Sequence, residues 1–489
     1  MMKKSYTILP FRFARFPNEE LLLVNEVGEF LFVKSGDFNK LINYELTSYD
    51  EIFLNLKGKH FIADANIENV VDMLAIKYRT KKAFLLNFTA LHMIVVTARC
   101  NSRCKYCHAS SEDVDKSRWD MTPSVAQKVV DMVFQSPSPI IKIEFQGGEP
   151  LLNWEVIKTI VEYAEALNKS KKKNLEFVLC TNLTLTTEEI LDYLKIHNVL
   201  ISTSLDGPQE IHNKHRVFRA GGGTYELFRE KFNLSKTILG LERIAALMTT
   251  TRHSLPHFRN IINEYINFGF QGAFIRPLNP FGFAKIDRKE LEYGVDDFIK
   301  AYKDALSYII DINLKGTFFV EYYASLFLAR ILTPFSSGFM DLQFPAGVGI
   351  SGVIYDYDGS VYPSDEARMM AKAGNKKFYL GNVTQDSYLN VFDGKLLHEL
   401  IQKSCAEILP GCSTCAFQIY CGSDPIRNYS EQGDIIGHRP TSEFCAINKA
   451  ILNYLFELLR NEDNNDVFWS WITNRSVMEI QGEELSRSC

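Results

Sequence analysis

The sequence lacks any apolar run long enough to cross a membrane. A spanning helix needs roughly 18 to 20 consecutive apolar residues, and no stretch of this chain approaches that length. In residues 1–16, Ser5, Tyr6, Pro10 and several basic residues interrupt the apolar ones, whereas a secretion signal has an unbroken apolar core. We therefore expect a cytoplasmic protein with no membrane partner.

An excess of basic charge is also lacking. The formal net charge is -5, whereas a protein that binds a nucleic-acid backbone needs a clear positive excess, so we expect no nucleic-acid partner. Internal repeats and low-complexity tracts are absent as well. With 46% hydrophobic and 23% charged residues among 489, the composition is that of a globular protein, and the length predicts roughly two to four domains.

Disulfide bonds are not expected, although the chain has ten cysteines. The cytoplasm keeps thiols reduced. Eight of the cysteines fall in two short regions, each near other cysteines. This clustering indicates metal binding.

From about residue 88 onward, short β-rich runs alternate with longer helical patterns. The expected strands are Leu91–Val96, Ile140–Phe145, Leu175–Thr181, Val199–Leu205, Arg243–Thr249 and Gly272–Pro277. The helices expected between and after them start with one capped by Thr122, followed by Trp154–Leu167, Thr187–Ile196, Tyr225–Thr237, Pro256–Phe268 and Val295–Ile312. Six strand–helix units predict an α/β fold. Its parallel sheet would form a partial (β/α)6 TIM-like barrel with the active site at the carboxyl ends of the strands.

The flanking regions have different patterns. Short strands at Leu21–Asn25 and Glu29–Val33, followed by helical stretches, predict a separate small α+β domain at the start of the chain. The expected domains are residues 1–85 (small α+β domain), 86–315 (barrel), 316–450 (loop-rich, with five cysteines) and 451–489 (C-terminal helical tail).

Three cysteines directly follow the first expected strand. Cys100, Cys104 and Cys107 have the spacing CxxxCxxC. Three thiolates on one tight loop can hold three irons of a [4Fe–4S] cluster and leave the fourth iron open for chemistry. The alternative is a structural zinc site with His108 as a fourth ligand, although zinc sites usually combine two ligand pairs separated by a longer span.

The context of this loop resembles the radical SAM superfamily over about residues 88–280. The second expected strand ends in Gln146-Gly147-Gly148-Glu149-Pro150, similar to the family's GGEP motif. The resemblance implies that S-adenosylmethionine (SAM) binds the open iron and that an electron from the cluster cleaves it to a 5′-deoxyadenosyl radical. It places four residues in the catalytic centre: Cys100, Cys104, Cys107 and Gln146.

The same resemblance assigns the cofactor contacts. Tyr106 is expected near the adenine, Gly147 and Gly148 let the backbone approach the ligand, and Glu149 accepts a hydrogen bond from the SAM ammonium. Further cofactor contacts are expected at Pro150, Thr181, Asn182, Ser204, Asp206 and Arg216. For the segment around Ser204 and Arg216 the alternative is an ordinary turn with a surface arginine. Cys180 is expected to be a small buried hydrophobe.

A second cysteine group resembles the SPASM domain, the auxiliary-cluster module of radical SAM enzymes that act on peptides and proteins. Its metal ligands are expected to be Cys412, Cys415, Cys421 and Cys445. Complete SPASM domains have seven cysteines for two clusters, and the resemblance implies that Ser364, Asp386 and Pro425 stand where three are lost. We therefore expect one auxiliary [4Fe–4S] cluster, with structural zinc as the alternative. Cys405 is expected to be a free thiol and Cys489 to be incidental.

The whole layout is similar to the His-Xaa-Ser system radical SAM peptide maturases. The segments that carry this likeness are Pro10–Phe13, Tyr362–Arg368 and Cys421–Pro425. It implies an oxidoreductase that modifies a ribosomally synthesised precursor peptide, with a side-chain carbon cross-link of the cyclophane type. Its expected partners are that precursor with its leader and a reductase or flavodoxin-type electron donor.

Several alternatives remain open at this point. Residues 1–85 could bind the leader as a winged-helix-like domain that adds a strand, or could cap the barrel structurally. A sulfatase-type maturase forming formylglycine is the nearest rival function, although such enzymes resemble the full seven-cysteine pattern. A non-catalytic metal-binding peptide scaffold is a rival from another class.

Overall fold

The chain folds into two compact units built from interleaved segments. The structure is a computed structural model that describes residues 5–64, 66–107, 109, 111–115, 117–279, 281–282, 284 and 287–480. One unit consists of Met1–Leu85, Leu326–Gly347 and Ile401–Asn453, and the other of Leu86–Ser325, Val348–Leu400 and Tyr454–Cys489. The range 316–450, expected as one domain, is thus divided between them.

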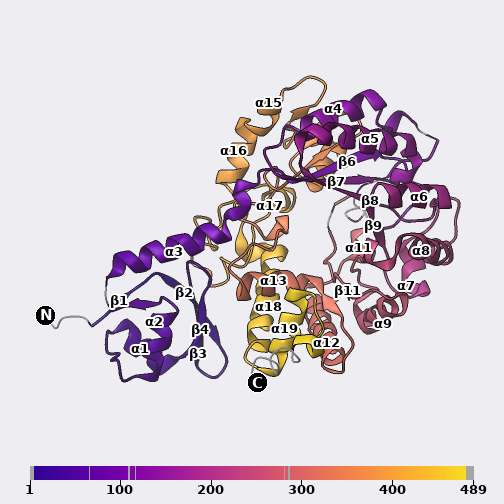
Figure 1. Cartoon of the computed structure of the whole chain (residues 1–489). Helices are drawn as coiled ribbons and strands as arrows, with labels where there is room; N and C mark the ends of the chain where they lie inside the picture. Colours follow the sequence, from indigo (N-terminus) through magenta and orange to yellow (C-terminus); the bar gives the residue numbers. More distant parts are fainter. Residues whose placement is uncertain are drawn as a thin grey trace. The chain divides into compact units, whose positions relative to one another are not determined.

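The larger unit contains an eight-stranded sheet in the order β10-β9-β8-β7-β6-β13-β14-β15. Five of its strands are β6 (Leu91–Thr97), β7 (Ile140–Gly147), β8 (Asn174–Cys180), β9 (Val199–Ser204) and β10 (Ile244–Leu247). They pair in parallel with their neighbours and follow one another as a curved row (Figure 1). The predicted α/β fold with a parallel sheet is confirmed.

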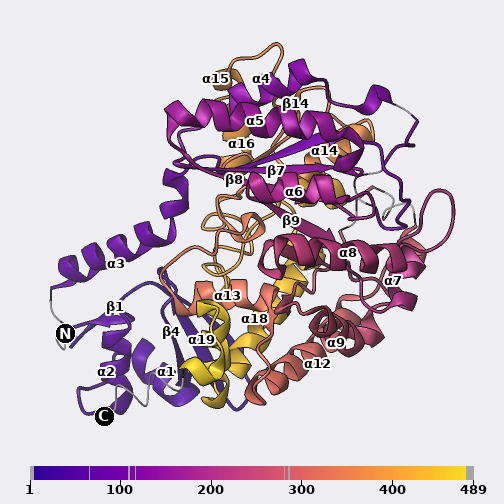
Figure 2. The same ribbon diagram turned by 45° about the vertical axis from the view of Figure 1, so that its right-hand side comes forward.

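Helices cover one face of this sheet. They are α4 (Pro123–Val133), α5 (Trp154–Lys171), α6 (Glu188–Ile196) and α8 (Tyr225–Leu239), on the outer side of the strands in Figures 1 and 2. Along β7, Ile141, Ile143 and Phe145 are buried, whereas Glu144 and Gln146 on the other face are only half-buried. A closed barrel is usually filled with bulky aliphatic residues. This polar, partly accessible inner face instead leaves room for a ligand.

The sheet differs from the prediction at both ends. The sixth expected strand is reduced to β11 (Gly272–Ala273), which pairs with β12 (Val320–Glu321) in a separate two-stranded sheet. The strand prediction Gly272–Pro277 is wrong beyond Ala273, because the buried side chain of Glu321 takes the amide of Ile275 and Pro277 has no amide hydrogen.

At the opposite end, three strands lie where loops were expected. They are β13 (Gly352–Tyr355), β14 (Ser360–Tyr362) and β15 (Gly381–Asn382). β13 pairs in parallel with β6 and is buried throughout, so it extends the sheet that carries the first cysteine loop.

The other unit begins with a small α+β arrangement, as predicted. Strands β2 (Phe11–Phe16), β3 (Glu20–Asn25) and β4 (Phe30–Lys34) form an antiparallel sheet, and β1 (Thr7–Ile8) pairs with β5 (Ile62–Ala63). Its helices are α1 (Ser35–Ile42), α2 (Glu51–Gly58) and α3 (Ile67–Lys81). Buried apolar residues from the strands, α1 and α2 form one core.

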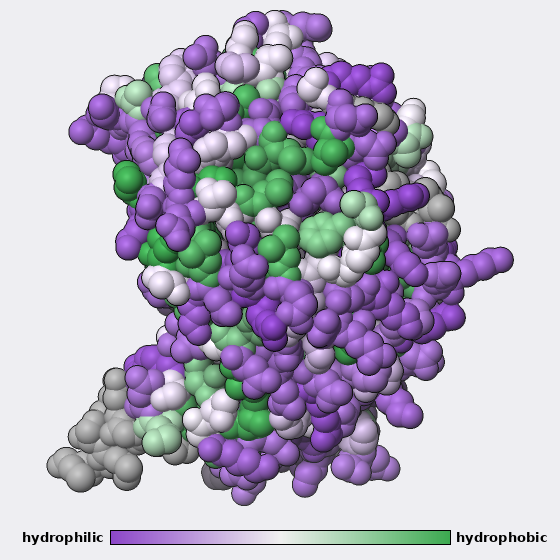
Figure 3. Space-filling model, turned by 90° about the vertical axis from the view of Figure 1, so that its right-hand side faces the viewer, coloured by the Kyte–Doolittle hydropathy of each residue, from purple (hydrophilic) through white to green (hydrophobic). Residues whose placement is uncertain are grey.

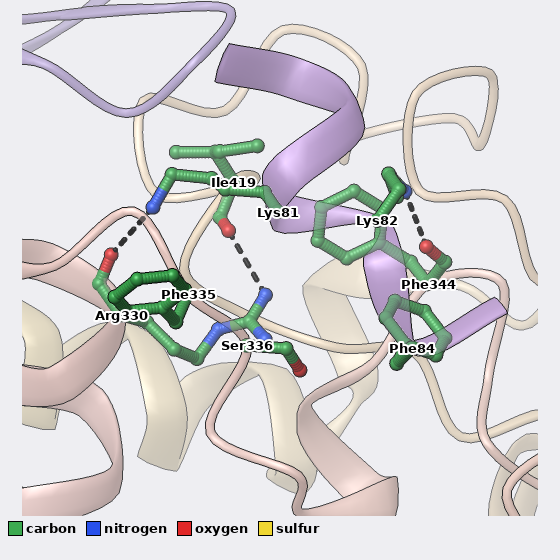
Figure 4. Close-up of a pocket in the computed structure, with 8 residues that line it drawn as sticks. All are labelled: Lys81, Lys82, Phe84, Arg330, Phe335, Ser336, Phe344 and Ile419. Atoms are coloured by element: carbon green, nitrogen blue, oxygen red, sulfur yellow. Dashed lines mark hydrogen bonds between the residues drawn. The ribbon is translucent and has the colours of Figure 1, made fainter. Parts of the chain in front are cut away.

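Cations at the end of α3 join this arrangement to the rest of the unit (Figure 4). Lys81 donates to the carbonyls of Arg330 and Thr333, both at 3.0 Å. Lys82 donates to the carbonyl of Phe344 and, at 2.6 Å, to Glu407. These ammonium groups replace water with partly buried carbonyl and carboxylate acceptors, so they fix the segments to one another.

The side of the molecule drawn in Figure 3 is mostly hydrophilic. Figure 3 shows the side on which α8 and α9 (Phe258–Phe268) lie in Figure 1, and there hydrophilic residues predominate while apolar residues form separate patches. In the described part of the chain, no helix is both long and apolar enough to cross a membrane.

Candidate functional site

The loop after β6 places Cys100, Cys104 and Cys107 at the carboxyl end of the parallel sheet. Its backbone is held by neighbouring segments: the amide of Cys100 donates to the carbonyl of Glu112 at 3.0 Å, and that of Lys105 to the carbonyl of His215 at 3.1 Å. Within the loop, the amide of Cys107 donates to the carbonyl of Cys104 at 3.1 Å. The loop is therefore a fixed support for its thiols.

The thiols of this loop lie within electrostatic reach of one another. Cys100 is buried, and Cys104 and Cys107 are half-buried. Burial, followed by the charges of Glu149 and the other two thiols, raises the pKa of Cys100 above its usual value, and burial raises the pKa of Cys104 to about 11. Such thiols stay protonated until a metal displaces the proton. His108 lies outside the described residues.

The two glycines after β7 let that strand end approach the cysteine loop. A side chain at Gly147, where φ is +151°, would place its Cβ 2.0 Å from the carbonyl oxygen of Thr97, and one at Gly148 would place it 2.2 Å from that of Arg99. The amides of Gly148 and Glu149 donate to these carbonyls at 2.9 and 2.7 Å. The glycines thus let the backbone approach the loop that leads to Cys100, while their approach to a ligand stays a prediction.

Glu149 is hydrogen-bonded to two of the other predicted cofactor residues. Its buried carboxylate accepts hydrogen bonds from the hydroxyl of Thr181 at 2.7 Å, the amide of Asn182 at 2.8 Å and the amide of Leu151 at 3.1 Å. Burial raises the pKa of Glu149 to about 7, although these donors oppose the shift. Pro150 begins the short 3-10 helix Pro150–Asn153 that follows.

Tyr106, Asp206 and Arg216 form a second group, in which the first two residues are buried. The Tyr106 hydroxyl donates to Asp206, as does Arg216 Nε at 3.0 Å, and the amide of Thr249 donates to the other carboxylate oxygen at 3.1 Å. Burial opposes ionisation of Asp206, but the charges of Arg216 and His212 bring its pKa below the usual value. Arg216 is thus the largely buried ion-pair partner of Asp206, with its side chain 13% exposed, and not an ordinary surface arginine.

Ser204 is the last residue of β9 and lies half-buried opposite Leu247 of β10. Gln146 lies on β7, which β8 separates from β9 in the sheet. Its amide donates to Glu144 Oε1 at 2.6 Å, and the thiol of Cys180 donates to the same oxygen at 3.2 Å. Cys180 is half-buried, and its thiol is hydrogen-bonded. It is thus not the small buried hydrophobe that we expected.

Glu144 itself is absent from the predicted site. The alternation of Lys142, Glu144 and Gln146 with apolar residues was the signal that could have identified it.

The second cysteine group lies in the other unit and lines one pocket. Cys412, Cys415, Cys421 and Cys445 share it with Gln418, Arg439 and Lys449, and its described lining contains no carboxylate. The expected ligand set is thus gathered at one place. Cys405 is not among the lining residues; its thiol donates to the carbonyl of Ile401 at 3.3 Å. Cys489 lies outside the described residues.

The chemistry of this pocket fits a bound anionic sulfur cluster. Arg439 Nε donates to Cys412 Sγ at 3.1 Å, and burial raises the pKa of Cys421 to about 12. Gln418 is 3% exposed, and its amide nitrogen has no partner in the described residues. Among those residues no three His, Cys, Asp or Glu side chains converge as the ligands of a single ion would.

The three residues expected at lost cysteine positions have structural contacts. Ser364 caps the helix α14 (Asp365–Lys372), accepting from the amide of Ala367 at 3.3 Å. Asp386 accepts from the amide of Asn382 at 2.8 Å. Pro425 is the first residue of α17 (Pro425–Gln432). Each therefore stabilises local backbone and offers no thiolate to a metal.

Comparison with known proteins places this geometry in context. Residues 94–275 match the family described as the Radical SAM superfamily. The Cysteine-type anaerobic sulfatase-maturating enzyme of Clostridium perfringens (strain 13 / Type A) is 27% identical over 377 residues, which are 75% of this chain and 96% of that enzyme. Uncharacterized protein MJ0907 of Methanocaldococcus jannaschii is 31% identical over 213 residues, 43% of this chain and 69% of that protein.

Two solved structures are similar in fold. Native anSMEcpe with bound AdoMet and Cp18Cys peptide aligns with a TM-score of 0.63 at 23% identity and covers 77% of this chain and 99% of that chain. Streptococcus suis SuiB bound to precursor peptide SuiA aligns with a TM-score of 0.55 at 15% identity and covers 90% of this chain and 99% of that chain. At these identities the likeness concerns the fold.

Proposed function

Because the chain belongs to the radical SAM superfamily, we propose that it is a maturase of a ribosomally synthesised precursor peptide. The product we propose is a side-chain carbon cross-link of the cyclophane type. The observation that carries the proposal is the connection of the cysteine loop to Glu149 through backbone hydrogen bonds of Gly148 and Glu149. These contacts tie a three-thiol metal site to a carboxylate at the same edge of the sheet.

The residues present fit the cofactors that the family implies. Cys100, Cys104 and Cys107 would hold a [4Fe–4S] cluster and leave one iron for SAM. Glu149 suits the SAM ammonium because its described hydrogen-bond donors are all neutral, so its charge is not yet compensated. When bound, the cluster and SAM supply a carbon radical able to remove a hydrogen atom from a C–H bond.

The chain's own residues then orient the reactants. Asp206 fixes the side chain of Tyr106, a residue of the cysteine loop, and keeps Arg216 in place. The half-buried inner face of the sheet, with Glu144, Gln146 and Cys180, offers polar contacts to a peptide inside the barrel. We assign leader binding to residues 1–85 and electron supply to a reductase or flavodoxin-type donor. The peptide substrate is supported by the likeness in fold to SuiB, whose structure holds the precursor peptide SuiA.

The nearest second function is formation of formylglycine. It is supported by the sulfatase-maturating enzyme described above, because the match to this chain covers 96% of that enzyme's length. We rank it second because such enzymes resemble the full seven-cysteine pattern. This chain has Ser364, Asp386 and Pro425 at three of the positions where that pattern has cysteine. The cross-link and the aldehyde are chemically distinguishable products.

The test is co-expression with a short peptide encoded beside the gene, followed by mass spectrometry. A cross-link removes two hydrogens from the peptide and leaves no group that reacts with a hydrazide. Formylglycine would react with the hydrazide. A peptide that returns with unchanged mass from the wild type, as it does from a variant lacking all three loop cysteines, would contradict the proposal for that peptide.

A further inference from the structure

The pocket of the second cysteine group is positively charged. Apart from its four cysteines, the described lining includes the cations Arg439 and Lys449 and no carboxylate. Phe417, Phe444 and Leu452 form apolar walls. In such a low-dielectric setting, a nearby cation interacts strongly with charge placed on the sulfurs.

Arg439 is held in its orientation toward the pocket. Its Nε donates to Cys412 Sγ at 3.1 Å, while Nη2 donates to the carbonyl of Ile436 at 2.7 Å and Nη1 to Asn428 Oδ1 at 3.4 Å. Gly411, with φ +76°, leaves space for the aliphatic part of the Arg439 side chain, because a Cβ at this position would lie 3.0 Å from Arg439 Cγ. The guanidinium is therefore preorganised at one sulfur ligand.

Gln418 supplies a second directed donor. Its side chain is buried, its amide nitrogen has no partner within the described residues, and it lines the same pocket. Leaving a buried amide N–H without an acceptor is energetically unfavourable. A sulfur atom of a cluster bound in this pocket would be the acceptor for the amide N–H of Gln418.

Arg330 holds the backbone of the loop that carries Cys421. Its Nε donates to the carbonyl of Tyr420 at 2.8 Å, and Nη2 to those of Ile419 at 2.9 Å and Cys421 at 3.3 Å. Figure 4 shows the guanidinium beneath the loop that carries Ile419. The loop that presents Cys421 is thus anchored independently of Arg439 and Gln418.

A cluster held by four thiolates is an anion, and reduction adds one more negative charge. N–H donors at sulfur and nearby cations stabilise the reduced form more than the oxidised form and so raise the reduction potential. We propose that Arg439 and Gln418 are positioning residues that raise the reduction potential of the auxiliary cluster, so that this site accepts and holds an electron. The inference rests on the proposed function only in that the four cysteines hold a [4Fe–4S] cluster.

The experiment is an EPR-monitored redox titration of the auxiliary cluster alone. The full chain with Cys100, Cys104 and Cys107 replaced by Ala is reconstituted anaerobically with iron and sulfide, and its midpoint potential is measured with dithionite and mediators. Arg439→Gln and Gln418→Leu should each shift the midpoint to a more negative value. Arg439→Lys, which keeps the charge, should shift it less than Arg439→Gln.

The matched control is Arg15→Gln, at an exposed position of β2 in the same unit, which should leave the midpoint unchanged. Equal midpoints in the Arg439→Gln, Gln418→Leu and Arg15→Gln proteins would overturn the inference, as would stoichiometric zinc in place of iron. If Arg439→Gln does not retain iron, Gln418→Leu and Arg439→Lys decide. Absence of a modified peptide would overturn the proposed function and leave these potentials unaffected.

Discussion

The hydroxyl of Thr181 donates to Glu149 at 2.7 Å and thereby joins the end of β8 to the segment after β7. The amide of Asn182 completes the link at 2.8 Å. Two strand ends that are 32 residues apart in the chain thus share one buried carboxylate. This carboxylate is coupled in turn to the first cysteine loop by the backbone contacts of Glu149 and Gly148.

Glu149 should make the stability of the metal-free protein depend on pH. Its pKa is raised from 4.5 to about 7. Between these two pH values the folded chain keeps a proton on Glu149 that the unfolded chain releases. The stability contribution is therefore complete below the unfolded pKa and is lost as pH rises through the folded pKa. A shift of this size corresponds to about 3 kcal/mol.

The measurement is urea unfolding of the wild type and Glu149→Gln at about pH 4, 6 and 8. The free energy of unfolding of the wild type should fall relative to that of the variant by up to about 3 kcal/mol as pH rises. Comparing the two proteins cancels the titration of other groups. The same pH dependence in both would contradict the account.

Gly148 should be intolerant of any side chain. A Cβ there would lie 2.2 Å from the carbonyl oxygen of Arg99, so Gly148→Ala must displace the backbone that leads to Cys100. We expect a loss of about 1–3 kcal/mol of stability together with loss of iron from the first cluster. Gly36→Ala is the control, since nothing lies within 4 Å of that position in α1. If both variants bound iron like the wild type, the role given to Gly148 would be wrong.

Lys82 and Glu407 should be coupled energetically. Their atoms lie 2.6 Å apart and their side chains are 11% and 28% exposed. Lys82→Met leaves a half-buried carboxylate without its largely buried cation, and we expect a loss of about 2–3 kcal/mol, discounted for the partial exposure of Glu407. The double variant Lys82→Met/Glu407→Gln should recover part of that loss in chemical unfolding. The exposed pair Lys57–Asp64, with side chains 48% and 28% exposed, is the control; equal losses there would refute the assignment.

The metal inventory follows from the two cysteine groups. Reconstituted protein should carry about eight irons, from two [4Fe–4S] clusters. The variant lacking Cys100, Cys104 and Cys107 should retain about four, because the pocket cysteines supply a complete ligand set. Cys180→Ala, at a cysteine outside both groups, should retain all eight. About twelve irons in the wild type would show a third cluster despite Ser364, Asp386 and Pro425.

Much of the barrel could be predicted from local patterns. Thr122 caps α4 as expected, accepting from the amide of Val125 at 3.3 Å with Pro123 in the first turn. The strands β6 to β10 follow apolar runs in the sequence and lie within a few residues of their predicted positions. Local signals of this kind depend only on neighbouring residues.

The remaining features depend on contacts between distant segments. β13 was expected as loop because its short run Gly352–Tyr355 becomes a strand only by pairing with β6. Likewise, no local pattern shows that Asp206 is the partner of both Tyr106 and Arg216, or that Arg439 contacts Cys412. The cysteine spacing identified the candidate ligands. The residues that surround these ligands could be identified only from the folded structure.

The central claim is that the first cysteine loop supports reductive cleavage of SAM. The most direct measurement is the amount of 5′-deoxyadenosine that anaerobically reconstituted, dithionite-reduced protein forms from SAM. We predict 5′-deoxyadenosine and methionine in equal amounts from the wild type and none from the variant lacking Cys100, Cys104 and Cys107. Wild-type protein with its full iron content that forms no more 5′-deoxyadenosine than this variant would contradict the claim.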